Sequence, residues 1–119
     1  MAVLTEGRHA GEFLLSEANG TLSRDTIAVA AGENLEAGAV VERNGSGKAV
    51  AYTGESDSDI AGVLFDAVDA TDGEVAGAVI IARLAEVKES AISVENDDTP
   101  ETIKAAAIVA LKTLDIVAR

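Results

Sequence analysis

The sequence predicts one small, mostly β domain with a single C-terminal helix. Runs rich in Val, Ile and Ala are separated by glycine-containing turns, and an Asn-Gly turn joins two of these runs. One well-defined helix start occurs near the C-terminus. The length of 119 residues suits one domain. Because 48% of the residues are hydrophobic but only 3% are aromatic, the core must consist mainly of aliphatic side chains.

Residues 1–24 differ from the rest of the chain. Gly7, Gly11 and Gly20 interrupt them, and their only strand-like piece is residues 12–16 (EFLLS). A segment with so few apolar anchors is typical of a flexible N-terminal arm. The alternative interpretation is a first β-strand of the domain, and the sequence favours neither.

The strands that follow are indicated by β-branched and apolar runs between turns. In chain order they are residues 26–30 (TIAVA), 39–42 (AVVE), 48–52 (KAVAY), 60–65 (IAGVLF) and 75–84 (VAGAVIIARL). The turn 43–47 (RNGSG) predicts a hairpin between the second and third. Alternation in residues 86–94 favours another strand, with Val87, Ala91, Ile92 and Val94 facing inward. This spacing predicts an antiparallel or mixed sheet.

The helix is signalled by residues 98–101 (DTPE), which supply an N-cap, a proline at the first helical position and an acidic first turn. Five of its apolar residues fall on one face at helical spacing. They are Ile103, Ala107, Ala110, Leu111 and Leu114. We expect residues 115–119 to form a short extended tail.

Composition excludes several functions. The chain has no Cys, which excludes disulfides, thiol catalysis and Cys-ligated zinc. Its 21 acidic and 9 basic residues give a net charge of −12, which argues against nucleic acid as a partner. A single His leaves no pair for a two-His metal site. We therefore predict no cofactor and no metal.

Neither a secretion signal nor a membrane span is indicated. The N-terminal residues have no basic stretch followed by a long apolar run. Purely apolar runs such as residues 78–82 (AVIIA) and 105–111 (AAAIVAL) are far shorter than the roughly 18–20 residues that span a bilayer. We expect synthesis in a cytoplasm and no membrane contact.

Two segments resemble ligand-binding loops, one for phosphate and one for calcium, but neither has the spacing that its motif requires. Residues 45–48 (GSGK) resemble a phosphate loop, but a Walker A motif needs Gly at position 42 and Ser or Thr at 49, where this chain has Glu42 and Ala49. A hairpin turn explains the segment. Seven acidic residues lie between Glu55 and Glu74, but Asp66, Asp69 and Asp72 do not have the spacing of a calcium loop. We interpret this stretch as a solvated acidic rim, with weak divalent-ion binding as the alternative.

No catalytic constellation is indicated. His9 is the only imidazole and lies among the N-terminal glycines, where nothing suggests the rigid placement that a general base needs. No nucleophile has an adjacent base in the sequence. We predict that the protein is not an enzyme.

The order of features is more specific than any single motif. A stretch with residues 12–27 (EFLLSEANGTLSRDTI) precedes a Leu-x-x-Gly-x-Val-Val turn at 35–41, the segment 48–54 and residues 61–64 (AGVL) followed by acidic residues. A helix opening with DDTPETIK ends the chain. This order resembles the lambda-type head decoration proteins of tailed phages over nearly the whole chain. The departures are Tyr52, where the lambda protein has Trp, and residues 12–21.

The resemblance implies a structural virion protein with a β-clip-like fold. Such proteins bind as homotrimers to the major capsid protein, at threefold positions on the outside of the expanded head, and stabilise the shell against packaged DNA. In this family the N-terminal arm orders on the capsid and adds a strand to the capsid protein. The resemblance thus implies a capsid-binding arm at residues 1–24 and a decoration domain at 25–119.

The residues of the arm suit strand addition, in which backbone hydrogen bonds supply affinity and alternate side chains supply specificity. The predicted capsid-binding residues are Glu12, Phe13, Leu14, Leu15 and Ser16. Alternation places Phe13 and Leu15 on one face, and we expect them to fill pockets on the capsid protein. Deleting residues 1–20 should abolish head binding and leave the domain folded.

Charge predicts when trimers form. Three copies would carry −36, or 3 × −12, and this repulsion disfavours a free trimer. We expect a monomer in solution that trimerises on the shell. The same acidity suits the outer surface, away from DNA phosphates.

A ligand-binding or carrier module is the alternative function. The segment 31–41 resembles turns of β-clip and lipoyl-like domains, and Lys48 follows a hairpin turn, as a modified lysine would. The Asp or Met that usually flanks such a lysine is missing.

Overall fold

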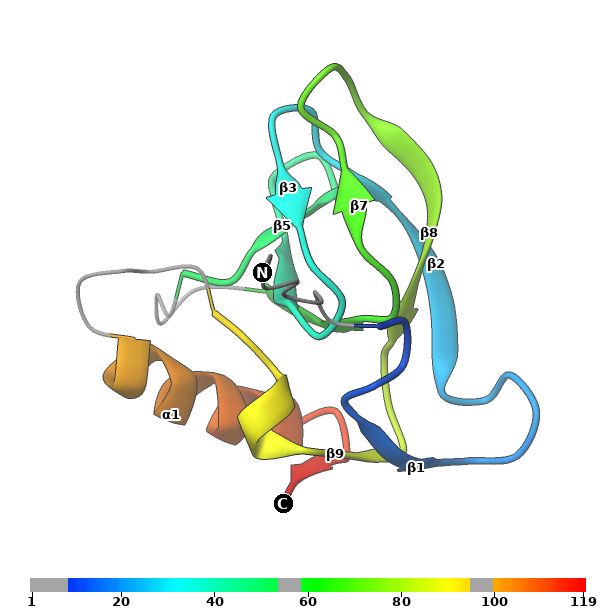
Figure 1. Ribbon diagram of the computed structural model, residues 1–119, viewed down its shortest axis with the longest axis vertical. Helices are drawn as coiled ribbons and strands as arrows, with labels where there is room; N and C mark the ends of the chain where they lie inside the picture. Colours follow the sequence, from blue (N-terminus) through cyan, green and yellow to red (C-terminus); the bar gives the residue numbers. More distant parts are fainter. Residues whose placement is uncertain (1–8, 54–58, 95–99) are drawn as a thin grey trace, which may run out of the picture.

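Five strands form a closed barrel in the structure, a computed structural model that describes residues 9–53, 59–94 and 100–119 (Figure 1). In barrel order the strands are β2 (Arg24–Val29), β5 (Ala49–Ala51), β4 (Val40–Arg43), β6 (Asp59–Leu64) and β8 (Val75–Ile81). Four of the five neighbouring pairs are antiparallel. The barrel closes where β2 and β5 run parallel at Val29 and Ala49.

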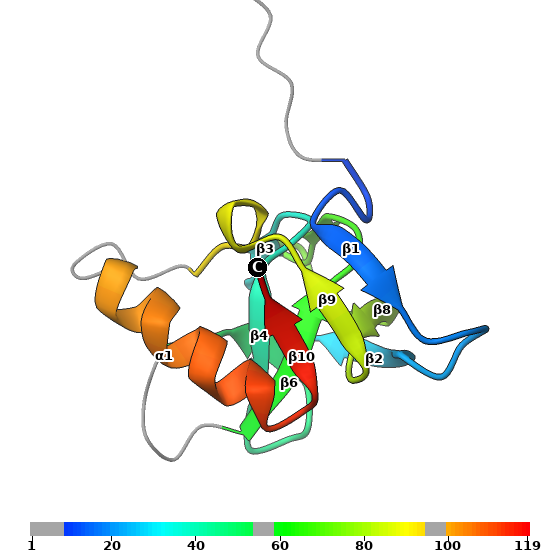
Figure 2. The ribbon, with the colours of Figure 1, turned by 90° about the horizontal axis from the view of Figure 1, so that it is seen from below.

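A second sheet and the helix cover one side of the barrel. The sheet has the order β1 (Leu14–Glu17), β9 (Ala85–Val87) and β10 (Ile116–Ala118), with β10 parallel to β9. Figure 2 shows these three strands side by side, with α1 (Pro100–Lys112) beyond β10. A 3₁₀ turn, η1 (Glu89–Ala91), follows β9, and the short strands β3 (Asn34–Leu35) and β7 (Val68–Asp69) pair at the other end of the barrel.

Two aliphatic cores follow from this arrangement. Alternate residues of a barrel strand point to opposite sides, because the side-chain period of a strand is two. In β6, Leu64 belongs to the cluster inside the barrel, and Val63 belongs to the cluster under α1 and the second sheet. Ile80 and Ile81 of β8 divide in the same way. The barrel wall is therefore apolar on both faces where α1 and the second sheet cover it.

Gly62 allows two barrel strands to approach closely. Its φ of +149° is rarely adopted by other residues, and a Cβ there would lie 2.2 Å from the carbonyl oxygen of Ile81. The register of β4 and β6 also shifts beside it, between Val41 and Glu42. Glycine is thus required for the β6–β8 contact.

Most predicted elements are confirmed. The five expected strands correspond to the five barrel strands, and the turn at 43–47 joins β4 and β5 as an antiparallel hairpin. The helix begins at Pro100, and the predicted face is confirmed because Ile103, Ala107 and Leu111 are buried. Asp98 and Thr99 of the predicted cap lie outside the described residues.

Three expectations about extent need correction. The strand expected over residues 86–94 is only β9, because η1 interrupts it, although Val87 and Ile92 are buried as predicted. The extended tail is a true strand, β10, that is fixed by its hydrogen bonds to β9. The third correction concerns β3 and β7, two strands of two residues each that the sequence did not indicate.

Of the first 24 residues, the structure describes residues 9–24. Of the two interpretations for the EFLLS segment, the structure has the first β-strand: β1 pairs with β9. The backbone oxygen of Phe13 also accepts a hydrogen bond from the Lys88 amide at 2.7 Å. This segment therefore packs on the domain in the free chain.

Candidate functional site

The five residues predicted to bind the capsid lie in β1 and the turn before it. Phe13 is 1% exposed and belongs to the core under α1, whereas Leu15 is 53% exposed. Leu14 packs against that core, and Glu12 and Ser16 are exposed. Alternation predicted that Phe13 and Leu15 share one outward face. In the free chain they do not, because Phe13 is buried and Leu15 is exposed.

The reason is local geometry. Phe13 precedes β1 in a turn, in which the Leu14 amide donates to the carbonyl oxygen of Gly11 at 3.0 Å. The register of β1 against β9 also shifts between Leu14 and Ser16. Simple alternation assumes an uninterrupted strand, so it fails at both places. Because Phe13 fills the core, deleting residues 1–20 would also remove a core side chain, and the expectation that such a deletion leaves the domain intact is revised.

An ion pair connects β1 to β2. The Arg24 guanidinium donates to both carboxylate oxygens of Glu17, at 2.8 and 3.0 Å, and its Cζ lies 4.3 Å from the ring centroid of Phe65. The hydrogen bond from Arg24 holds the pKa of Glu17 below its ordinary value, against a smaller opposing effect of burial. Both side chains are partly exposed. The pair anchors the end of β1 without burying a charge.

One edge of β1 pairs with β9, and no strand of the described residues pairs with its other edge. An unpaired strand edge presents backbone donors and acceptors that another chain can use. Leu15 stands exposed on this edge strand. β1 could therefore bind a partner strand while it stays paired with β9.

Two exposed leucines were not singled out by the sequence. Leu22 is 62% exposed in the turn between β1 and β2, and Leu84 is 46% exposed in the turn between β8 and β9. Leucine in a turn flanked by polar residues is the signal that could have found Leu22. The positive φ of Leu84 has no signal in the sequence.

The other predicted candidates are dispersed. His9 is exposed at the start of the described chain, and its backbone amide donates to the Glu12 carboxylate at 3.3 Å. Lys48 lies at the base of the β4–β5 hairpin, not at its tip, and forms an ion pair with Glu74. A carrier lysine needs a free hairpin tip, so this position does not favour the carrier alternative.

The acidic stretch is spread over turns. Asp66, Asp69 and Asp72 are exposed, and Glu55 and Asp57 lie outside the described residues. Hydrogen bonds from the Thr71 hydroxyl and amide lower the pKa of Asp69, as in an ordinary Asx turn. Within the described ranges, no group of three or more acidic or His side chains is arranged to hold a metal ion.

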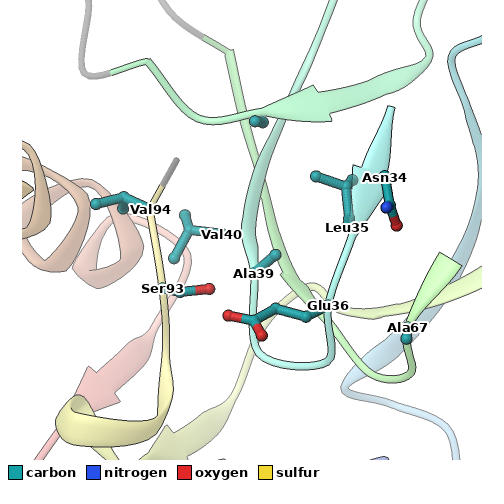
Figure 3. Close-up of a pocket in the computed structure, with 9 residues that line it drawn as sticks. Asn34, Leu35, Glu36, Ala39, Val40, Ala67, Ser93 and Val94 are labelled. Carbon is teal, nitrogen blue, oxygen red and sulfur yellow. The ribbon is translucent and has the colours of Figure 1, made fainter. Parts of the chain in front are cut away.

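A pocket of about 390 Å³ opens beside β3 and β4 (Figure 3). Its wall is mostly aliphatic, and Glu36 and Ser93 supply carboxylate and hydroxyl oxygens. Its lining includes neither an aromatic side chain nor a nucleophile beside a base. Val94 lines one side of the pocket.

The features that stand out are thus exposed leucines and an edge strand, which another protein chain can use for pairing. No helix in the described ranges is both long and apolar enough to cross a membrane. The fold defines a small β-barrel domain covered on one side by a second sheet and a helix.

A family model of the bacteriophage lambda head decoration protein D matches residues 3–116, nearly the whole chain. The chain belongs to this family of phage head decoration proteins, which have a structural role at the capsid and are not a class of enzyme. The resemblance seen in the order of sequence features is confirmed. A search of curated proteins and a search of solved structures found no match.

Proposed function

We propose that the protein binds the major capsid protein on the outer surface of a phage head, as trimers at threefold positions, and stabilises the expanded shell against the pressure of packaged DNA. The observation that carries this proposal is the family match over residues 3–116. The family gives the structural capsid role. The trimer, the threefold position and the resistance to pressure are the finer steps that we propose.

The charge of the chain supports an outer position. At −12, it would be repelled by DNA phosphates on the inside of a filled head. Before the protein binds the head, the same charge keeps the free copies soluble at high concentration. A decoration protein needs this solubility because many copies must be available when the head expands.

We further propose that residues 12–16 form the capsid contact, through the edge of β1 with which no strand of the described residues pairs. Backbone hydrogen bonds along this edge would extend a capsid strand pairing, and Leu15 would enter an apolar pocket on the capsid protein. Phe13 contributes indirectly, because its burial in the core fixes where the edge strand lies. This form of strand addition requires no unfolding of β1.

The test is binding to undecorated heads of the phage, measured by occupancy and by electron microscopy of the threefold positions. Wild-type protein should give protrusions there and raise the temperature at which filled heads release DNA. Leu15→Asp should weaken binding by about tenfold or more, equivalent to about 1.4 kcal/mol, because it places a charge in an apolar contact. Its thermal unfolding should match that of the wild type, since Leu15 is exposed.

Ala76→Asp is the matched control, because Ala76 is an exposed position in barrel strand β8 that gains the same charge. It should bind heads as the wild type does. Equal binding by Leu15→Asp and Ala76→Asp would contradict the β1 contact, and no binding by the wild type would contradict the decoration function.

A further inference from the structure

Four large apolar side chains are exposed among the described residues: Leu15, Leu22, Leu84 and Val109. Single exposed apolar residues are ordinary on a protein surface. Here Leu22 and Leu84 lie on two turns that are hydrogen-bonded to each other, and Val109 lies near the exposed Ala105 on the outer side of α1. Three of the four therefore belong to two defined surfaces that the β1 contact does not use.

The first, which we term the paired-turn surface, consists of Leu22 and Leu84 with the turns that carry them. The buried Ser23 hydroxyl donates to the carbonyl oxygen of Leu84 at 2.9 Å and accepts from the Ala18 amide at 3.0 Å. The Arg83 guanidinium donates to the carbonyl oxygen of Leu22 at 2.9 Å and forms an ion pair with Asp25. The two leucines are thus presented on a rigidly connected support.

Leu84 also adopts a backbone conformation that leucine rarely takes. Its φ is +54°, in the left-handed region, where a residue other than glycine, Asn or Asp is strained. The side chain gains no core burial in return, since it is 46% exposed. Strain of this kind persists only where the surrounding structure holds it, and it is concentrated at functional sites.

The second, which we term the outer helix face, consists of Ala105 and Val109 of α1. Val109 is 67% exposed and Ala105 is exposed, while Ala107 and Leu111 on the opposite side are buried. The exposed Lys112, three residues after Val109, lies beside them on the same side of the helix and adds a positive charge there. Figures 1 and 2, which share their horizontal axis, place α1 on the left of the molecule and the turn between β1 and β2 on the right.

Charge distinguishes these two surfaces from the rest of the molecule. Residues 17–25, 82–85 and 103–114 hold four of the nine cationic side chains and only two of the twenty-one acidic ones. Those two, Glu17 and Asp25, are paired with Arg24 and Arg83. Two copies at −12 each repel wherever acidic surfaces meet, so a contact through these two surfaces, which carry few acidic side chains, meets less repulsion than one through the acidic residues of 59–74.

We propose that the partner of both surfaces is a second copy of this chain: the paired-turn surface of one copy packs on the outer helix face of the next. Because the two surfaces are different and lie on different sides, the contact is heterologous and closes into a ring when its rotation allows. This rests on the proposed trimer and names the surfaces that form it.

The absence of cysteine from the chain allows a direct test. Leu22→Cys and Val109→Cys proteins are prepared separately, mixed, and treated with a short bismaleimide in high salt and again on undecorated heads. The mixture should give covalent dimers several-fold above either protein alone, and the double variant should give a covalent trimer. Ser46→Cys mixed with Val109→Cys is the control, because Ser46 is exposed in the distant β4–β5 turn.

A second variant separates contact from folding. Leu84→Asn removes the apolar side chain but suits a left-handed conformation, so it should fold at least as stably and crosslink less when combined with Leu22→Cys. Crosslinking no better than the Ser46 control, or dominant Leu22-to-Leu22 dimers, would overturn the proposal. Head occupancy by the wild type is scored separately: occupancy without the crosslink refutes only the interface, and the crosslink without occupancy refutes only the decoration function.

Discussion

At the scale of single residues, the barrel depends on the absence of a side chain at Gly62. Gly62→Ala would place a methyl group against the Ile81 carbonyl oxygen, at a φ that alanine does not tolerate. We expect a loss of about 3 kcal/mol or more in the free energy of unfolding, from the clash and the backbone strain together. Urea unfolding measures this loss.

Gly45→Ala is the matched control for this prediction. Gly45 lies in the β4–β5 turn, and a Cβ there meets nothing within 4 Å. Its free energy of unfolding should stay within about 0.5 kcal/mol of the wild type, as for most surface substitutions. Equal stability of the two variants would show that β6 and β8 can separate at Gly62 without cost.

The sequence predicted single residues well where a regular period governs them. Helical spacing identified the buried face of α1, including Ile103 and Leu111. It failed for Phe13 and Leu15, because a turn and a register shift separate them and alternation no longer applies. The exposed Leu84 was missed for a related reason: no local pattern indicates its left-handed backbone, and its carbonyl oxygen accepts a hydrogen bond from Ser23, sixty-one positions away in the chain.

At the scale of elements, β1 is held by contacts that depend on pH. The pKa of Glu17 is lowered in the folded state by Arg24, so the folded protein binds the proton less readily than the unfolded chain does. The pair's stabilisation is therefore complete above the unfolded pKa of about 4.3 and is lost as the pH falls through the folded pKa below it. Acid should therefore weaken the attachment of β1 to β2 at its C-terminal residue, Glu17.

The test compares wild type with Glu17→Gln by urea unfolding at about pH 6 and about pH 3. Glu17→Gln should be less stable by about 0.5 kcal/mol at the higher pH, a typical value for a partly exposed ion pair, and nearly equal at the lower pH. Glu89→Gln, at an exposed position, should track the wild type at both. A deficit of Glu17→Gln that persists unchanged in acid would contradict the ion-pair account.

Elements with strong local signals were predicted, and elements defined by their partners were not. The β4–β5 hairpin follows from its Asn-Gly turn, and α1 follows from its proline and apolar face. In contrast, β10 is a strand only because β9 offers it hydrogen bonds, and β7 exists only opposite β3. The same dependence applies to β1, which is a strand of the domain because β9 pairs with it and the core accommodates Phe13.

At the scale of the whole molecule, closure of the barrel was beyond the sequence. It requires β2 to pair antiparallel with β8 and parallel with β5, and no local pattern encodes which distant strands become neighbours. The family relationship, which the order of motifs did indicate, is a whole-chain property and covers residues 3–116. The structural role was therefore predictable although the exposed surfaces of the site were not.

Net charge leads to the last prediction, on assembly in solution. Each copy carries −12, so we expect the free protein to sediment as a monomer at low ionic strength. Raising the salt from about 0.02 M to about 0.5 M shortens the Debye length and should promote self-association, because the apolar contacts remain while the repulsion is screened. Sedimentation velocity over a range of protein concentrations measures both states.

Val109→Asp should remain monomeric at high salt, because it adds a charge to the outer helix face, whereas Ala76→Asp, with the same added charge, should associate as the wild type does. A trimer that persists at low salt and at all concentrations would contradict the idea that charge delays assembly until the shell brings the copies together.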